Sequence, residues 1–144
     1  MGSIKSIKKI SNKKIRSGES FLFSAGFNVD KSLNNTERVD EEIKDLKRLI
    51  KHKAKVFVLS HQGRFKKKDT IHFDFLVPYL RRKLKCKVIY FRKDIAKNIT
   101  KIKNLIKPGE VLLLPNSRFY HGEENNNVRL GKLFASIADN IIIG

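Results

Sequence analysis

Short hydrophobic runs alternate with amphipathic stretches along most of the chain. The runs fall at residues 20–25, 54–60, 87–91, 111–114 and 141–143. The run from Ala54 to Ser60 is nearly all apolar in its middle, which is typical of a parallel strand covered on both faces. We therefore expect five strands.

The stretches between these runs have helical spacing. The first carries Val39, Ile43, Leu46 and Ile50. Asn35 or Thr36 is expected to cap this helix. Similar spacing predicts helices over 73–84, 95–106 and 127–137, and the helix over 95–106 is expected to stop at Pro108-Gly109. Strands that alternate with helices imply right-handed crossovers. The expected fold is α/β, a three-layer Rossmann-like domain with a parallel sheet of about five strands and helices on both faces.

Length and composition indicate one folded domain. The chain has 144 residues, of which 40% are hydrophobic, too many for a disordered protein. We divide it into a basic leader, 1–19, and a domain, 20–144. The sequence has no apolar run near the length of about 18 residues that spans a bilayer, and no secretory leader, so a cytoplasmic location is expected. The single cysteine, Cys86, fits a reducing compartment and is not expected to be a nucleophile.

The charge is strongly basic. Lys and Arg number 32 against 14 acidic residues, a net charge of +18. Such an excess attracts any polyanion, but charge alone does not select one. The absence of a known nucleic-acid motif and the few aromatics among the basic runs speak against a nucleic-acid-binding protein, which is kept as an alternative.

The leader has two interpretations. It is either a solvated tail or a membrane anchor, because Gly2 and Ser6 fit the pattern for N-myristoylation. The lysines that follow would supply the second, polybasic signal that stable attachment to an acidic membrane surface requires.

Three loops that follow strands carry residues suited to anions. Ligands of parallel sheets gather outside the carboxyl ends of the strands. The residues in question are Gly26, Asn28 and Arg38 after the first strand, His61, Gly63 and Arg64 after the second, and Asn116, Arg118 and His121 after the fourth. Guanidinium groups match carboxylate and phosphate oxygens with paired hydrogen bonds. Together they predict an anion site. No metal site is expected.

The same regions resemble the N-terminal domain of phosphoglycerate kinase. The matching stretches are FNV at 27–29, NNTER at 34–38, AKVFVLSHQGR at 54–64, KPGEVLLLPNSRFY at 107–120, EENN at 123–126 and LFASIAD at 133–139. The family has RVDFNV, AKVxLxSHLGRP, KPGxVLLLENLRF, EExN and LASxAD in the same order. The resemblance covers nearly the whole chain.

The resemblance implies a role in glycolysis. In that family this domain binds 3-phosphoglycerate, a second domain binds magnesium-ATP, and a phosphoryl group passes to the substrate carboxylate. Carried over by position, the substrate-binding residues are Asn28, Arg38, His61, Arg64 and Arg118. Arg38 would also be catalytic, because it would stabilise the transferring phosphoryl group.

The departures from the family pattern limit this expectation. Gly26 replaces the aspartate that binds the substrate hydroxyl, and Ser24 replaces an arginine. The last basic loop of the family's N-terminal domain and its whole nucleotide-binding domain are absent from these 144 residues. We therefore expect an incomplete N-terminal domain, which uses magnesium-ATP only if a C-terminal domain exists. We expect this chain to bind anions without turnover. The alternative is a non-catalytic subunit that binds a protein partner.

Overall fold

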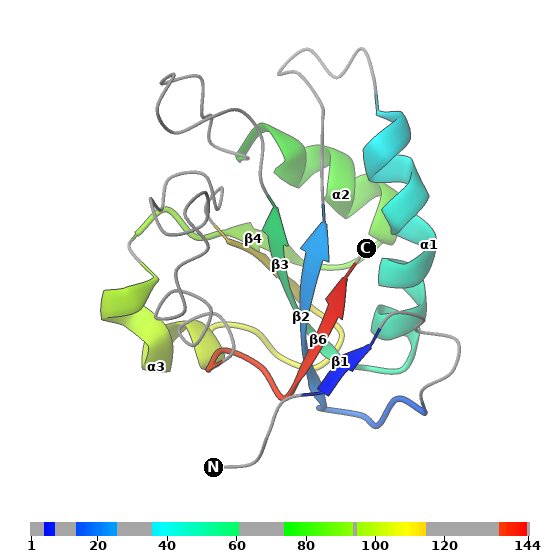
Figure 1. Ribbon diagram of the computed structural model, residues 1–144. Helices are drawn as coiled ribbons and strands as arrows, with labels where there is room; N and C mark the ends of the chain where they lie inside the picture. The colour runs from blue at the N-terminus through cyan, green and yellow to red at the C-terminus, as the bar shows by residue number, and fades with distance from the viewer. Residues whose placement is uncertain are drawn as a thin grey trace.

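The computed structural model describes residues 5–7, 14–25, 36–60, 74–93, 95–114 and 136–143. Its centre is a six-stranded sheet in the order β1-β6-β2-β3-β5-β4 (Figure 1). The strands are β1 Lys5–Ile7, β2 Ser20–Ala25, β3 Lys55–Ser60, β4 Val88–Tyr90, β5 Val111–Leu113 and β6 Asn140–Ile143. Every neighbouring pair among them is parallel, which confirms the predicted sheet.

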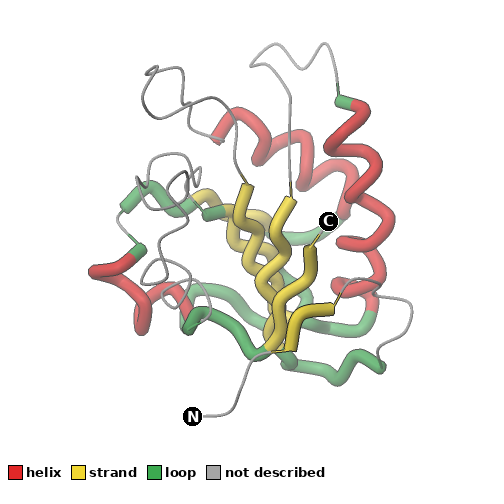
Figure 2. Tube along the Cα trace, viewed as in Figure 1, coloured by secondary structure: helices red, strands yellow, loops and turns green. Residues whose placement is uncertain are grey.

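Helices cover both faces of this sheet, as expected (Figure 2). The helical elements are α1 Glu37–Lys51, α2 Val77–Leu84, α3 Ile99–Lys103, and the 3-10 turns η3 Asp74–Leu76 and η4 Ala96–Asn98. α1 and α2 lie on one face, and α3 lies on the other (Figure 1). The three layers follow from the chain order, since right-handed crossovers put a helix on one face or the other according to the direction of each step across the sheet.

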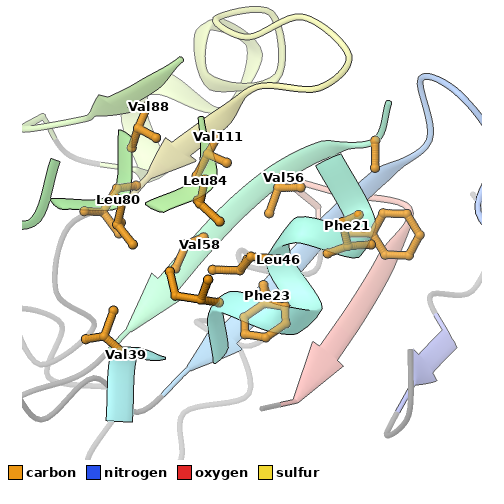
Figure 3. Packing of buried hydrophobic residues seen from close by; sticks show 14 of the residues in the cluster. Phe21, Phe23, Val39, Leu46, Val56, Val58, Leu80, Leu84, Val88 and Val111 are labelled. Atoms are coloured by element: carbon orange, nitrogen blue, oxygen red, sulfur yellow. The ribbon is translucent and has the colours of Figure 1, made fainter. Parts of the chain in front are cut away.

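Alternate residues of strands β2 to β6 build two separate cores. Phe21, Phe23, Val56 and Val58 face α1 and α2 and pack against Leu46, among others (Figure 3). The intervening side chains, including Leu22, Phe57 and Leu112, face the other way and pack with Ile102 and Ile106. Burial on both faces explains why the middle strands read as continuous apolar runs.

One strand more than the five expected, β1, comes from the segment that was expected to be a basic leader. β1 pairs with β6, Lys5 opposite Asn140 and Ile7 opposite Ile142. Ile15 is 8% exposed and belongs to the core beneath α1 and α2. Residues 1–19 are therefore in part integrated into the domain. The alternating pattern missed β1 because three residues are too few to show a period.

The third helix is shorter than its apolar spacing suggests. Helical spacing runs from Ile95 to Ile106, and both residues are buried, yet α3 spans five residues. Asn98 interrupts it with a φ of −134°, and the side chain of Asn104 donates to the Thr100 carbonyl oxygen at 2.8 Å. Asparagine side chains compete with helical hydrogen bonds in this way. The helix expected over 127–137 lies outside the described residues except at 136–137, which form a turn.

Polar contacts fix the register of β6. Asn140, 6% exposed, donates from Nδ2 to Glu19 Oε2 at 2.9 Å and to the Ser20 carbonyl oxygen at 3.2 Å. Next to it, Ser20 Oγ donates to Asp139 Oδ2 at 3.0 Å and accepts from the Asp139 backbone N–H at 2.9 Å. A slip of one residue would invert the side chains of a strand. These bonds oppose that slip at the start of β6.

Candidate functional site

Three neighbouring strands end together at one edge of the sheet, which we call the carboxyl edge. Ala25, the last residue of β2, pairs with Ser60, the last residue of β3. β5 continues this line, because Val58 pairs with Leu113 and the Leu114 N–H donates to the Val58 carbonyl oxygen at 2.9 Å. The arrowheads of β2 and β3 point to this edge at the top of Figure 1. Neighbouring strands lie about 4.8 Å apart, so the segments that follow them start close together.

In the sequence, most of the predicted site residues come soon after the ends of these strands. Gly26 follows β2 directly, and His61 follows β3 directly. The residues Gly26, Asn28, His61, Gly63, Arg64, Asn116, Arg118 and His121, and Gly2 of the leader, lie outside the described residues. Their roles stay predictions.

Arg38 is placed by its backbone in the first turn of α1, two residues after Thr36. α1 follows β2, and its first turn begins at the carboxyl edge (Figure 1). The backbone therefore brings Arg38 to the edge of the sheet from which the segments with the other predicted residues start. Its side chain lies outside what the structure describes.

A polar contact, which we call the first-turn tie, holds the start of α1 against α2. Thr36 Oγ1 donates to Asp40 Oδ2 at 2.8 Å, and the hydroxyl of Tyr79 donates to Asp40 Oδ1. Thr36 is the N-cap residue, as predicted, but its hydroxyl bonds to this carboxylate instead of to a backbone N–H. The tie thus joins the helix turn that carries Arg38 to the second helix.

The tie has a defined charge state. The hydrogen bonds from Tyr79 and Thr36 and the charge of Lys83 lower the pKa of Asp40, although desolvation opposes them. Burial, followed by the bond to Asp40, raises the pKa of Tyr79. Arg82 and Lys83 lie over the Tyr79 ring, with Cζ and Nζ at 5.4 and 5.6 Å from its centroid. At neutral pH the tie is therefore a phenol that donates to a carboxylate.

A second polar pair lies beyond the end of β4. Arg92 pairs with Asp74 of η3, and its guanidinium carbon lies 5.7 Å from the centroid of the Tyr90 ring. Neither the tie nor this pair is predicted by the sequence. Asp40 stood out only as an acidic residue of an early helical turn, and no local pattern shows that Tyr79 or Asp74 would reach its partner.

Cys86 is not a reactive thiol. It is unpaired and half-buried, and its pKa is raised to about 11, first by burial and then by the charge of Glu110. A thiolate is the nucleophilic form, so the group is inert at neutral pH. This agrees with the prediction that Cys86 is not a nucleophile.

The described residues contain no group of three His, Cys, Asp or Glu side chains that could hold a metal ion. No helix among them is long and apolar enough to cross a membrane.

Comparison with known proteins extends the resemblance seen in the sequence. The family model described as "Phosphoglycerate kinase" matches residues 14–143. The phosphoglycerate kinase of Wolbachia sp. subsp. Brugia malayi is 32% identical over 126 residues, and that of Rhodospirillum centenum is 33% identical over 129. Each match covers 85% of this chain and 32% of the relative, so the chain spans about a third of the length of these curated relatives.

Solved structures show the same likeness. The structure of phosphoglycerate kinase from Coxiella burnetii matches with a TM-score of 0.75 at 25% identity, covering 98% of this chain and 35% of that one. The enzyme from Pyrococcus horikoshii matches in fold, with a TM-score of 0.72 at 23% identity, covering 90% of this chain and 36% of that one.

Proposed function

Because this chain belongs to the phosphoglycerate kinase family, we propose that it binds 3-phosphoglycerate, or a similar phosphorylated three-carbon acid, at the carboxyl edge of its sheet. The family match includes the segments after β2, β3 and β5 that carry the predicted anion-binding residues. The proposal concerns binding by these 144 residues.

One observation carries the proposal: the register of β2, β3 and β5. Because of this register, the three segments that contain Asn28, Arg64 and Arg118 begin at adjacent positions along one edge of the sheet. Guanidinium groups from separate loops can then reach one small anion. Ligands of parallel sheets bind in this place, outside the carboxyl ends of the strands.

The proposed roles follow from charge and chemistry. His61, Arg64 and Arg118 hold the phosphate and carboxylate groups, and Asn28 orients the substrate by hydrogen bonding. Arg38 neutralises charge on the phosphoryl group during transfer in a complete enzyme. Phosphoryl transfer depends chiefly on positioning and charge stabilisation, which these side chains supply.

Turnover is not proposed for this chain alone. The resemblance to the family implies that magnesium-ATP binds to another domain, so we propose no magnesium-ATP site for these 144 residues. Gly26 in place of the family's aspartate also leaves open a subunit that binds the anion without catalysing a reaction.

The test is isothermal titration calorimetry of 3-phosphoglycerate into the whole chain and into Arg64→Ala. Loss of a bidentate contact is expected to weaken binding about tenfold or more, while the melting temperature stays the same. Arg48→Ala is the matched control, because Arg48 is exposed near the opposite end of α1. Absence of binding to the unaltered chain would refute the proposal. A lower melting temperature with unchanged affinity would make Arg64 a structural residue.

A further inference from the structure

The edge where the strands begin, which we call the amino edge, carries a row of cations. In sheet order, β2, β3, β5 and β4 lie side by side, and each begins shortly after a turn with an exposed basic residue. These residues are Arg16 before β2, Lys53 before β3, Lys107 before β5, and Lys85 and Lys87 before β4. We call these five side chains the amino-edge row. Strand spacing makes it roughly 15 Å long.

Hydrogen bonds between neighbouring turns hold the row in place. Gly18 N–H donates to the Lys53 carbonyl oxygen, and Gly109 N–H donates to the Ala54 carbonyl oxygen, both at 2.8 Å. Val111 N–H donates to the Lys87 carbonyl oxygen at 3.0 Å. The cations therefore stand on one connected set of turns. Their order along the edge is the order of the strands.

Two of these turns have the same construction. Arg16-Ser17-Gly18-Glu19 and Lys107-Pro108-Gly109-Glu110 each place a glycine at positive φ, 83° and 86°. In each, the glutamate Oε1 accepts from the backbone N–H of the basic residue, at 3.1 and 2.8 Å. The acidic side chain is thus bonded to the backbone of its own turn, while the basic side chain is exposed.

The row also contains both described non-glycine residues with positive φ. Lys53 has a φ of 60° and Lys85 a φ of 54°. L-residues other than glycine and asparagine rarely adopt this conformation, and glycine is the usual residue after a helix. Glycine would relieve the backbone strain at both positions, but each carries a lysine. The positive charge at these positions therefore points to a function.

The basic side chains of the row are available to an external ligand. Among the described residues, none of the five pairs with a carboxylate. Gly109 leaves room for Lys53, since a Cβ at that glycine would lie 3.3 Å from Lys53 Cδ and 3.8 Å from its Nζ. Residues 14–19, 52–55, 85–87 and 107–110 contain no Phe, Tyr or Trp that could stack on a base or enter a bilayer.

From this arrangement we propose that the amino-edge row binds the phosphate backbone of a nucleic acid without regard to sequence. A narrow line of cations fits a linear polyanion better than a flat lipid surface or a small anion. Without aromatic side chains the contact depends on phosphates alone, so affinity falls steeply with salt. This site lies at the opposite end of the strands from the proposed 3-phosphoglycerate site.

The test uses a fluorescent oligothymidylate and measures anisotropy over a range of salt concentrations. The double variant Lys53→Gly with Lys85→Gly removes two charges and relieves two strained residues. We expect the double variant to bind about tenfold more weakly at low salt. The slope of the logarithm of the binding constant against the logarithm of the salt concentration should be smaller by about 1.4, or near 0.7 for each lost phosphate contact. The melting temperature is expected to stay the same or rise, which a purely structural role for these lysines does not predict.

The matched control is Lys47→Ala with Lys101→Ala, which removes two exposed helical charges outside the row. An equal loss of binding in the control would overturn the proposal, because the charge would then act diffusely. Binding by phosphatidylserine vesicles but not by oligothymidylate would also overturn it, in favour of a membrane. If the glycine variant fails to fold, Arg16→Gln with Lys107→Gln gives the same test and keeps both turns intact.

A competition experiment locates the site. Saturating 3-phosphoglycerate is expected to leave the oligonucleotide bound, because the two sites lie at opposite edges. Displacement would overturn the assignment to the amino edge. If the unaltered chain binds the oligonucleotide but not 3-phosphoglycerate, the proposal for the carboxyl edge fails while this one stands.

Discussion

Ser24 and Ala25 end β2, and Gly26 follows them directly. Ser24 is half-buried and pairs with Leu59 on one side and Ile143 on the other. The family pattern has arginine and aspartate at positions 24 and 26. Removing only one partner of a buried ion pair is strongly destabilising, because the other charge is left unpaired. The absence of both charges is therefore what we expect if they were partners.

The first prediction concerns the selectivity that depends on that aspartate. Without the carboxylate, the site is expected to bind 3-phosphoglycerate and a phosphorylated acid lacking its hydroxyl within about threefold of each other. The double variant Ser24→Arg with Gly26→Asp is expected to restore a preference for the hydroxyl, because a site built around that hydrogen bond rejects ligands that lack it.

Calorimetry of both ligands at one fixed salt concentration measures this selectivity, since charge attraction is screened by salt. Gly26→Asp alone serves as the control, because Ser24 cannot neutralise the new charge. A strong preference for 3-phosphoglycerate in the unaltered chain would contradict the prediction and assign the hydroxyl to another group, such as Asn28.

At the scale of elements, the first-turn tie joins α1 to α2. Tyr79→Phe removes the bond to Asp40 and is expected to lower the free energy of unfolding by about 1 kcal/mol at neutral pH. The pKa of Asp40 is lower in the folded state, so the tie stabilises fully above the ordinary pKa of this carboxyl and loses the effect as the pH falls from there through the lowered folded-state pKa. The difference between variant and parent should therefore shrink below about pH 4.

Urea unfolding at several pH values measures this difference. Asp40→Asn and the double variant complete a thermodynamic cycle that isolates the contact from other effects of either change. A difference that stays constant down to acid pH would mean that Tyr79 acts by packing alone.

The two glycine turns give another prediction at the same scale. Gly18→Ala and Gly109→Ala each put a Cβ at positive φ, and each is expected to cost about 1–2 kcal/mol. The nearest side-chain atoms are Pro108 Cγ at 4.0 Å for Gly18 and Lys53 Cδ at 3.3 Å for Gly109. Lysine is flexible, so the losses should be similar. A much larger loss at Gly109, measured by urea unfolding, would mean that Lys53 cannot move.

The helices differ in how well the sequence predicts them. α1 has four apolar positions on one face and acids in its first turn, so propensity, pattern and charge all agree. In the third helix the apolar spacing persists while Asn98 and Asn104 break the backbone pattern. The hydrophobic period indicates which residues are buried. In this segment Ile95 and Ile106 are buried although they lie outside α3.

At the scale of the whole molecule, the alternation of elements predicts a parallel sheet but does not reveal β1 and leaves the position of β6 open. Polar contacts of Asn140 and Asp139 with Ser20 hold β6 beside β2, although these residues lie about 120 positions apart in the chain. The candidate site shows the same division. The sequence motifs indicate which residues belong to it, and the strand register starts their segments at one edge of the sheet. The distances between the side chains depend on loops that lie outside the described residues.

The last prediction concerns β6, which is inserted between β1 and β2. Ile142, 2% exposed, packs in the core, and Ile142→Val is expected to lower the free energy of unfolding by about 1 kcal/mol. Joining β6 to β2 closes a long loop, which favours late formation. The change should therefore act mainly on the unfolding rate in stopped-flow experiments. A matching fall in the folding rate would place β6 in the folding nucleus.

The position of β6 also has a consequence during synthesis. Of the six described strands the ribosome makes β1 first, yet the strand that β1 pairs with, β6, is the last. Until residues 140–143 leave the ribosome, β1 is an unpaired segment and β2 has one edge open. At about 5–20 residues per second, this interval lasts several seconds or longer. The nascent chain therefore offers an exposed strand edge to chaperones, or to other nascent copies, until β6 emerges.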